Sequence, residues 1–127
     1  MYIETTHDIE VKVLPFYVPE QSDPDGERYL FGYHVTITNL GTRETKLVSR
    51  HWIITDGTNH VEEVRGEGVV GLQPTVYPGQ SFEYTSACPL PTPTGNMRGS
   101  YHMVDATGRR LTIRIPLFFL RHPNTFH

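Results

Sequence analysis

Period-two alternation of apolar and polar side chains is the feature that most limits how this chain can fold. It is clearest in residues 29–37, where one face would carry Tyr29, Phe31, Tyr33, Val35 and Ile37. A shorter run of the same kind, residues 9–13, is the first predicted strand. This spacing is typical of strands with one solvated face, because side chains on a strand point alternately to its two sides. No long stretch has helical spacing, so the chain is predicted to be all-β.

Turn residues divide the chain into strand-length segments. Asp56-Gly57 lies between two strand-like runs and predicts a hairpin with a type I′ turn. Pro78-Gly79 predicts a type II turn. With turns about every eight to twelve residues, the pattern predicts an antiparallel β-sandwich of about seven strands. We expect the charged segment 19–28 to be an exposed loop.

Size and composition agree with a single all-β domain spanning residues 1–127. A chain of 127 residues suits one domain, and we expect its core to lie within roughly residues 5–120. Val, Ile and Thr total 33 residues, whereas Ala and Lys contribute two each. Residues that favour strands therefore greatly outnumber the best surface-helix formers.

Charge and hydropathy argue against two classes of partner. The formal net charge of −3 argues against nucleic-acid binding driven by net charge. The longest apolar run, residues 115–120, is far shorter than the roughly 20 residues of a spanning helix, so no membrane insertion is expected. A single cysteine, Cys88, excludes an intramolecular disulfide, and the polar N-terminal residues do not resemble a signal peptide. We therefore expect a cytoplasmic protein.

Residues 66–71 match the glycine spacing of a dinucleotide-binding loop. The three glycines are Gly66, Gly68 and Gly71. That motif places a pyrophosphate on the N-terminus of the following helix, but Pro74 and Pro78 leave no room for a helix here. The segment is therefore predicted to join two β-segments through a bulge or crossover. The alternative is an anion-binding loop that uses backbone N–H groups and Arg65.

The predicted hairpin also brings charged side chains together. With a two-residue turn at Asp56-Gly57, His51 would face Glu62, and on the other side Arg50 would face Glu63. A His–Glu pair can bind a divalent cation, but a surface cross-strand pair accounts for the same residues. No histidines have the spacing of a preformed zinc site, so no metal site is predicted and His51 with Glu62 is the weaker alternative.

No catalytic group is predicted. Ser49 and His51 would share one face of a strand, too far apart for a nucleophile and its base, and no oxyanion-hole motif accompanies them. Trp52 is assigned to the core. Cys88, beside Pro89 in a predicted loop, has no basic neighbour in the sequence and is expected to be inert. We expect neither an enzymatic activity nor a cofactor.

Two segments are candidates for contact with another protein. Residues 117–120 are all apolar and cannot alternate cleanly, so one or two of these side chains are expected to be exposed. Segment 89–97 contains three prolines, which favour an extended loop that would present Leu90 and Met97. The same segment can equally be a rigid loop without a partner.

Several motifs occur in one order along most of the chain. They are Ser49-Arg50-His51-Trp52, residues 64–71 followed by Gln73-Pro74, Pro78-Gly79, residues 82–84, Thr92-Pro93 with Gly95 and Met97, residues 99–101, and Ile115-Pro116. Over roughly residues 5–120, this combination resembles the ApaG family. The resemblance implies an immunoglobulin-like, fibronectin type III-like sandwich and an association with cobalt resistance and magnesium efflux. It implies no settled catalytic activity.

We therefore predict a non-enzymatic protein-interaction module. The residues expected to contact an unidentified protein partner are Arg50, Arg65, Leu90, Met97 and Phe119. The alternative function is binding of a nucleotide, a pyrophosphate-containing metabolite or a divalent cation through the Gly66–Gly71 loop. A weak homodimer formed by pairing of edge strands is a further alternative.

Overall fold

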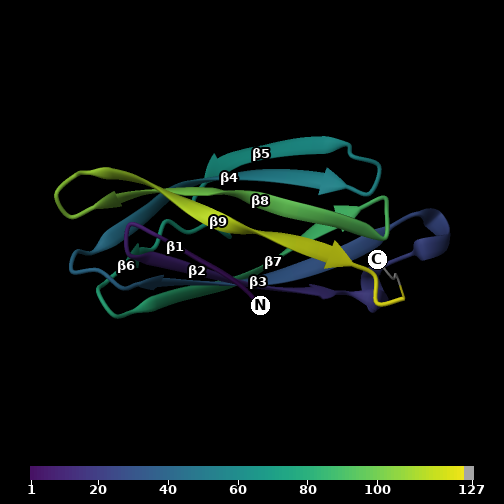
Figure 1. Ribbon diagram of the computed structural model, residues 1–127, viewed down its shortest axis with the longest axis horizontal. Helices are drawn as coiled ribbons and strands as arrows, with labels where there is room; N and C mark the ends of the chain where they lie inside the picture. Colours follow the sequence, from purple (N-terminus) through teal and green to yellow (C-terminus); the bar gives the residue numbers. More distant parts are fainter. Residues whose placement is uncertain (125–127) are drawn as a thin grey trace.

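Two antiparallel sheets pack face to face in residues 1–124, which are the residues described by the structure, a computed structural model (Figure 1). The first sheet has the order β1-β2-β3-β7 and consists of β1 (Tyr2–Thr6), β2 (Ile9–Tyr17), β3 (Tyr29–Asn39) and β7 (Ser81–Leu90). The second has the order β5-β4-β8-β9, with β6 also paired to β4. Its strands are β4 (Thr45–Asp56), β5 (Val61–Glu67), β6 (Thr75–Val76), β8 (Thr94–Asp105) and β9 (Arg110–Arg121). The predicted antiparallel β-sandwich is confirmed.

Two strands were missed by the sequence prediction of about seven. The chain starts with β1 rather than with residues 9–13, and β6 is only two residues long. β1 has no apolar alternation because Ile3 is exposed while Glu4 is half-buried. Its hairpin with β2 closes through His7 and Asp8, which both have positive φ, as a two-residue type I′ turn requires.

Segment 19–28 is an exposed connection, as predicted. It contains two short 3-10 turns, η1 (Pro19–Gln21) and η2 (Pro24–Gly26), and only Ser22 is half-buried. Within residues 1–124, no helix has the length and apolar character that a bilayer crossing requires.

The core lies between the two sheets and centres on aromatic side chains. Trp52 of β4 is buried and packs edge-on against Phe118 and Tyr101, with ring centroids 5.9 Å and 6.4 Å away. Tyr33 of β3 packs against it from the opposite sheet, at 5.3 Å. Each such side chain stabilises the fold by roughly 1.5–3 kcal/mol through removal of apolar surface from water. The assignment of Trp52 to the core is confirmed.

The two long edges of the sandwich differ. At one edge, β9 lies against β1: the backbone N–H of Arg114 donates to the Thr6 hydroxyl, and the Arg114 guanidinium pairs with Glu4 at 3.2 Å. At the other edge, β5 forms the outer margin of its sheet (Figure 1) and every residue of it except Gly66 is exposed. The sandwich is therefore open along the edge between β5 and β7.

Candidate functional site

A β-bulge in β4 decides which side chains reach the open edge. The register of β4 against β8 shifts between Leu47 and Ser49. The Val48 carbonyl at this bulge accepts hydrogen bonds from the Gly68 N–H and the Gln73 side chain. After the shift, Arg50 and Trp52 lie on the inner side of the sheet, whereas Ser49 and His51 lie on its outer side.

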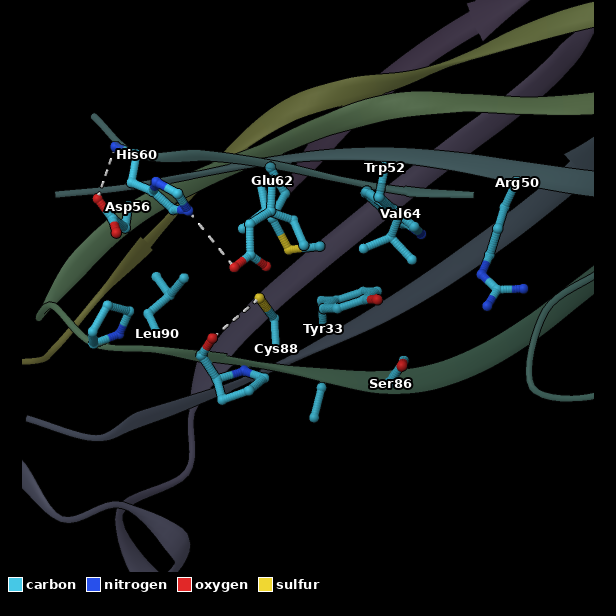
Figure 2. A pocket seen from close by; sticks show the side chains of 15 residues that line it. Tyr33, Arg50, Trp52, Asp56, His60, Glu62, Val64, Ser86, Cys88 and Leu90 are labelled. Atoms are coloured by element: carbon cyan, nitrogen blue, oxygen red, sulfur yellow. Dashed lines mark hydrogen bonds and ion pairs between the residues drawn. The ribbon is translucent and has the colours of Figure 1, made fainter. Parts of the chain in front are cut away.

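A cavity opens along this edge, and we call it the open-edge groove (Figure 2). It has a volume of about 370 Å³. Its principal lining residues are Arg50, Trp52 and Ile54 of β4, Glu62 and Val64 of β5, Ser86, Cys88 and Leu90 of β7, Tyr33 of β3 and Met97 of β8. The groove therefore combines an apolar interior with a few charged and hydroxyl groups, a composition typical of binding sites.

Arg50 is held at one end of the groove by main-chain carbonyls. Its Nη1 donates to the carbonyl oxygens of Glu67 and Gly68, each at 2.9 Å. A Cβ added to Gly66 would lie 2.9 Å from Cζ and from both Nη atoms of Arg50. These equal distances place the guanidinium face-on against Gly66, which can lie there only because it lacks a side chain.

The other two glycines of the motif also have structural roles. Gly68 has φ +60°, and a Cβ there would lie 2.1 Å from the Leu72 carbonyl oxygen. Gly71 has φ +79° in a tight turn closed by reciprocal hydrogen bonds between Val69 and Leu72, both 2.8 Å. The segment thus connects β5 to β6 without a helix, as predicted. The N–H groups of Gly68, Val69 and Leu72 bond to protein carbonyls, which removes them as donors to an anion.

Two hydroxyl groups lie at the same end of the groove as Arg50. Figure 2 shows the Tyr33 hydroxyl directed toward Arg50, with the Ser86 side chain on the neighbouring strand. Burial raises the pKa of Tyr33, while the Ser86 hydroxyl and the Arg50 charge oppose that rise. Tyr33 is therefore protonated at neutral pH and remains a hydrogen-bond donor.

Cys88 lies in β7 and is buried, which corrects its predicted place in a loop. The alternation of Phe82 and Tyr84 simply continues through Ser86 and Cys88 to Leu90, so Pro89 does not end the strand. Pro is compatible with this position because β7 is an edge strand. Burial raises the pKa of the Cys88 thiol to about 11, and the Glu62 carboxylate adds to the rise.

The turn at the other end of the groove is longer than predicted. β4 ends at Asp56 and β5 begins at Val61, so four residues, 57–60, connect the two strands instead of the two-residue turn, and Thr55 pairs with Val61. Asp56 organises it: one carboxylate oxygen accepts from the backbone N–H groups of Thr58 and His60 and from the Thr58 hydroxyl, at 2.7–3.1 Å. The hydrogen bond from the Thr58 side chain is the main cause of a lowered pKa at Asp56.

This longer loop changes the predicted cross-strand pairs. Glu62 lies opposite Ile54 and faces the groove, whereas His51 lies opposite Arg65 on the outer face. His51 and Glu62 therefore cannot share a cation, and Arg50 faces Gly66 instead of Glu63. The outer-face partner of His51 is the Glu63 carboxylate, at 2.8 Å. Within residues 1–124, no three His, Cys, Asp or Glu side chains are grouped so that they could hold a metal ion.

Ser49 has a partner that the sequence analysis did not identify. Its hydroxyl contacts His102 Nδ1 at 3.0 Å, across β4 and β8, and the Ser100 hydroxyl lies 3.4 Å from His102 Nε2. The residues come from neighbouring strands of one exposed face, so the contact is a cross-strand pair.

Leu90 and Met97 are not presented at the surface as predicted. Leu90 ends β7 and Met97 lies in β8, and their side chains are only 4% and 1% exposed. Both point inward because they occupy the core-facing positions of strands, where the sequence analysis expected an extended loop. They still line the open-edge groove together with Arg50.

The remaining predicted contact residues lie elsewhere. Arg65 is exposed on the outer face and pairs with Glu63 at 3.6 Å. In β9, Leu117 and Phe119 are exposed while Phe118 and Leu120 are buried, so two side chains of that run are exposed, as expected. The Arg121 guanidinium lies 5.7 Å from the centre of the Phe119 ring. Neither Arg65 nor Phe119 lines the open-edge groove.

Comparison with known proteins agrees with this architecture. The ApaG domain profile matches residues 19–105, more than half of the chain. The chain belongs to the ApaG family. The protein ApaG of Bordetella pertussis is 55% identical to it over 121 residues, which cover 95% of this chain and 92% of the relative. The ApaG protein of Dechloromonas aromatica is 53% identical over 119 residues, 94% of each chain.

A solved structure shares the ApaG fold. The crystal structure of a Bordetella pertussis protein described as ApaA has a TM-score of 0.90 and 56% sequence identity. The match covers 93% of this chain and 96% of that chain. The family resemblance found in the sequence is thereby confirmed.

Proposed function

We propose that this ApaG-family chain is a non-enzymatic, cytoplasmic interaction module that docks a partner protein in the open-edge groove. The observation that carries the proposal is the open edge itself, where a partly apolar cavity of about 370 Å³ lies between two edge strands and has Arg50 fixed at one end. Of the predicted contact residues, Arg50, Leu90 and Met97 contribute to this surface.

The exposure of β5 supports this choice of surface. Val61 and Val64 of β5 are 52% and 39% exposed, and Val64 faces the groove. Edge strands have backbone groups without a partner on one side, and a chain that adds to such an edge gains main-chain hydrogen bonds as well as side-chain pockets. A protein segment could therefore cover both Val64 and the groove.

The association with cobalt resistance and magnesium efflux belongs to the same proposal. We infer that the effect on cation tolerance runs through the docked partner, with the groove as the point of contact. The His51 and Glu62 side chains, the pair considered for a cation, lie on opposite faces of the sheet. Groove variants should therefore fail to restore cobalt tolerance to cells that lack the protein.

A pair of valine substitutions tests the docking proposal. Val64→Arg places a charge in the groove, and Val61→Arg places the same charge on the outer face of the same strand. Affinity capture should recover the same stoichiometric partner with the unmodified chain and with Val61→Arg, but not with Val64→Arg. Undiminished recovery with Val64→Arg would contradict the proposal.

Titration with small ligands tests the alternative function. Amide resonances of residues 65–71 are followed while ATP, diadenosine polyphosphate, Mg²⁺ or Co²⁺ is added. We expect no saturable shifts at millimolar concentration. Saturation at micromolar concentration would assign this loop to a nucleotide, a pyrophosphate-containing metabolite or a cation instead.

A further inference from the structure

We propose that the open-edge groove recognises an extended acidic and apolar peptide segment, with one carboxylate of the segment paired with Arg50 and an adjacent apolar side chain packed against Val64. This inference rests on the proposed docking function and specifies the chemistry of the partner. The occupant is a segment of a partner protein in strand conformation, lying along the edge of β5.

Arg50 is a fixed cation without a carboxylate partner among the described residues. Every other arginine of the described residues is exposed, whereas Arg50 is half-buried. None of the ion pairs within residues 1–124 includes Arg50. Arg50 is half-buried and its assigned hydrogen bonds go to neutral carbonyls. A cation in this position gains most from an incoming anion, because it is already partly removed from water.

The Arg50 side chain is already held in place before a ligand binds. The Glu67 and Gly68 carbonyls fix Nη1, and Gly66 lies against the guanidinium face. Gly66 and Glu67 are the last two residues of β5 and Gly68 follows directly, so the strand that would pair with the segment also holds the cation. A preorganised side chain loses little entropy on binding.

Two hydroxyl groups beside Arg50 can add hydrogen bonds to a bound carboxylate. The Tyr33 hydroxyl and the Ser86 side chain lie at the same end of the groove (Figure 2). A carboxylate has two oxygens that accept hydrogen bonds, and a guanidinium with neighbouring hydroxyl groups can supply donors to both.

The charge of the whole groove favours a carboxylate over a phosphate group. Glu62 and Asp56 also line the groove, away from Arg50, and His60 lies 3.8 Å from the Glu62 carboxylate (Figure 2). A dianion would be repelled by these carboxylates and would have only one fixed cation to balance it. A single carboxylate bound at the Arg50 end keeps its charge beside the cation and away from Asp56 and Glu62, and its apolar neighbours fit the surface beside Val64.

Selection from a displayed library of random seven-residue peptides tests the inference. We expect the peptides that bind the unmodified chain to contain Asp or Glu next to an aliphatic or aromatic residue. Changing that acid to its amide should weaken binding about tenfold or more, because it removes the charge and keeps the shape. Enrichment of peptides without an acidic residue, or of basic peptides, would overturn the inference.

A matched pair of arginine variants identifies the receiving group. Arg50→Gln should weaken binding of the acidic peptide about as much as changing the acid to its amide does. The two changes together should reduce the affinity no more than either change alone. Arg65→Gln, on the outer face, should leave binding unchanged. If Arg50→Gln does not fold, amide shifts of the unmodified chain decide: acid and amide peptides should differ at residues 50, 66–68 and 86, and equal shifts there would overturn the inference.

The outcomes separate the inference from the function on which it rests. A phosphoserine peptide that binds more tightly than its glutamate counterpart would overturn the assignment of a carboxylate. Peptides that bind in a Val64-dependent way but ignore Arg50 would overturn this inference and leave the docking function standing. A chain that selects no peptide and captures no Val64-dependent partner would contradict both.

Discussion

The Arg50 guanidinium lies face-on against Gly66, with Cζ and both Nη atoms 2.9 Å from the place where a Cβ of residue 66 would be. One glycine of the G-x-G-x-x-G segment therefore serves to position an arginine, and two carbonyls of the same segment hold it. The motif resembles a phosphate loop in spacing, yet it organises a cation at the end of a protein groove.

Gly66→Ala should displace Arg50 with a limited loss of stability. The atoms in conflict are at the end of a flexible side chain, which can move away, so the main cost is the loss of hydrogen bonds to two carbonyls, about 1.5–3 kcal/mol. Urea unfolding measures this free energy. Gly99→Ala is the contrasting variant: its Cβ would lie 2.0 Å from the His51 carbonyl oxygen, which is backbone, so it should cost clearly more. Equal costs would contradict this account of Gly66.

Gly68→Ala should lose more stability than Gly71→Ala, although both glycines have positive φ. Position 71 is open, so the alanine there suffers only from its left-handed backbone, at about 1–2 kcal/mol. At position 68 the same conformation is combined with a Cβ 2.1 Å from the Leu72 carbonyl, and the loss should exceed roughly 3 kcal/mol. Thermal or urea denaturation of the two variants checks the order, and the reverse order would show that the turn is built differently.

Because the Tyr84 and Tyr101 hydroxyls share a buried hydrogen bond, the stability effects of substitutions at these two positions should be strongly non-additive. Tyr84→Phe leaves the fully buried Tyr101 hydroxyl without its partner and should cost about 1–3 kcal/mol. The double variant, with Phe at both positions, should lose less unfolding free energy than the two single variants lose in sum. A double-mutant cycle in urea measures the coupling, and simple additivity would argue against the bond.

Two aspartate-centred turns should make stability decrease in acid. The pKa of Asp56 is lowered by the Thr58 side chain, and that of Asp105 by the Thr107 side chain in an equivalent turn. A pKa lowered on folding stabilises the protein above the unfolded value, near 4, and this contribution is lost as pH falls through the folded value.

Asp105→Asn isolates one of these contributions, because it keeps the acceptor oxygen and removes the ionisation. The free energy of unfolding is measured at pH 7 and at pH 3. The unmodified chain should lose more stability between these pH values than the variant does. An equal loss in both proteins would contradict the role of the Asp105 carboxylate.

Cys88 should react slowly with thiol reagents while the protein is folded. Its thiol is buried and has a pKa of about 11, so little thiolate is present at pH 8. Reaction with a disulfide reagent should be far slower than that of glutathione and should accelerate in urea. Rapid modification of the folded chain would show that the groove opens more widely than the structure indicates.

The sequence predicted the strands that alternate and missed those that do not. Period-two patterns located β2, β3 and β9, and the Tyr77–Gln80 turn has the expected positive φ at Gly79 and a hydrogen bond from Gln80 N to Tyr77 O. β1 has no such pattern, because Ile3 is on its exposed face.

The groove was predicted only in part, for reasons of register. Arg50, Leu90 and Met97 were selected, but Val64 of β5 and the hydroxyls of Tyr33 and Ser86 were not. The four-residue connection 57–60 turned Glu62 to the groove side, so it no longer faces His51. The length of this connection is not encoded in the Asp56-Gly57 pair alone. Continuing the alternation of residues 82–84 through Pro89 would have placed Ser86 and Cys88 inside.

Photo-crosslinking from β5 in the protein's native cells tests the docking account most directly. A photoreactive phenylalanine derivative is placed at Val64, which faces the groove, and separately at Val61, which is on the outer face of the same strand. The account predicts one discrete adduct with another protein from position 64 and none of that mass from position 61. No adduct from position 64, or the same adduct from both positions, would contradict it.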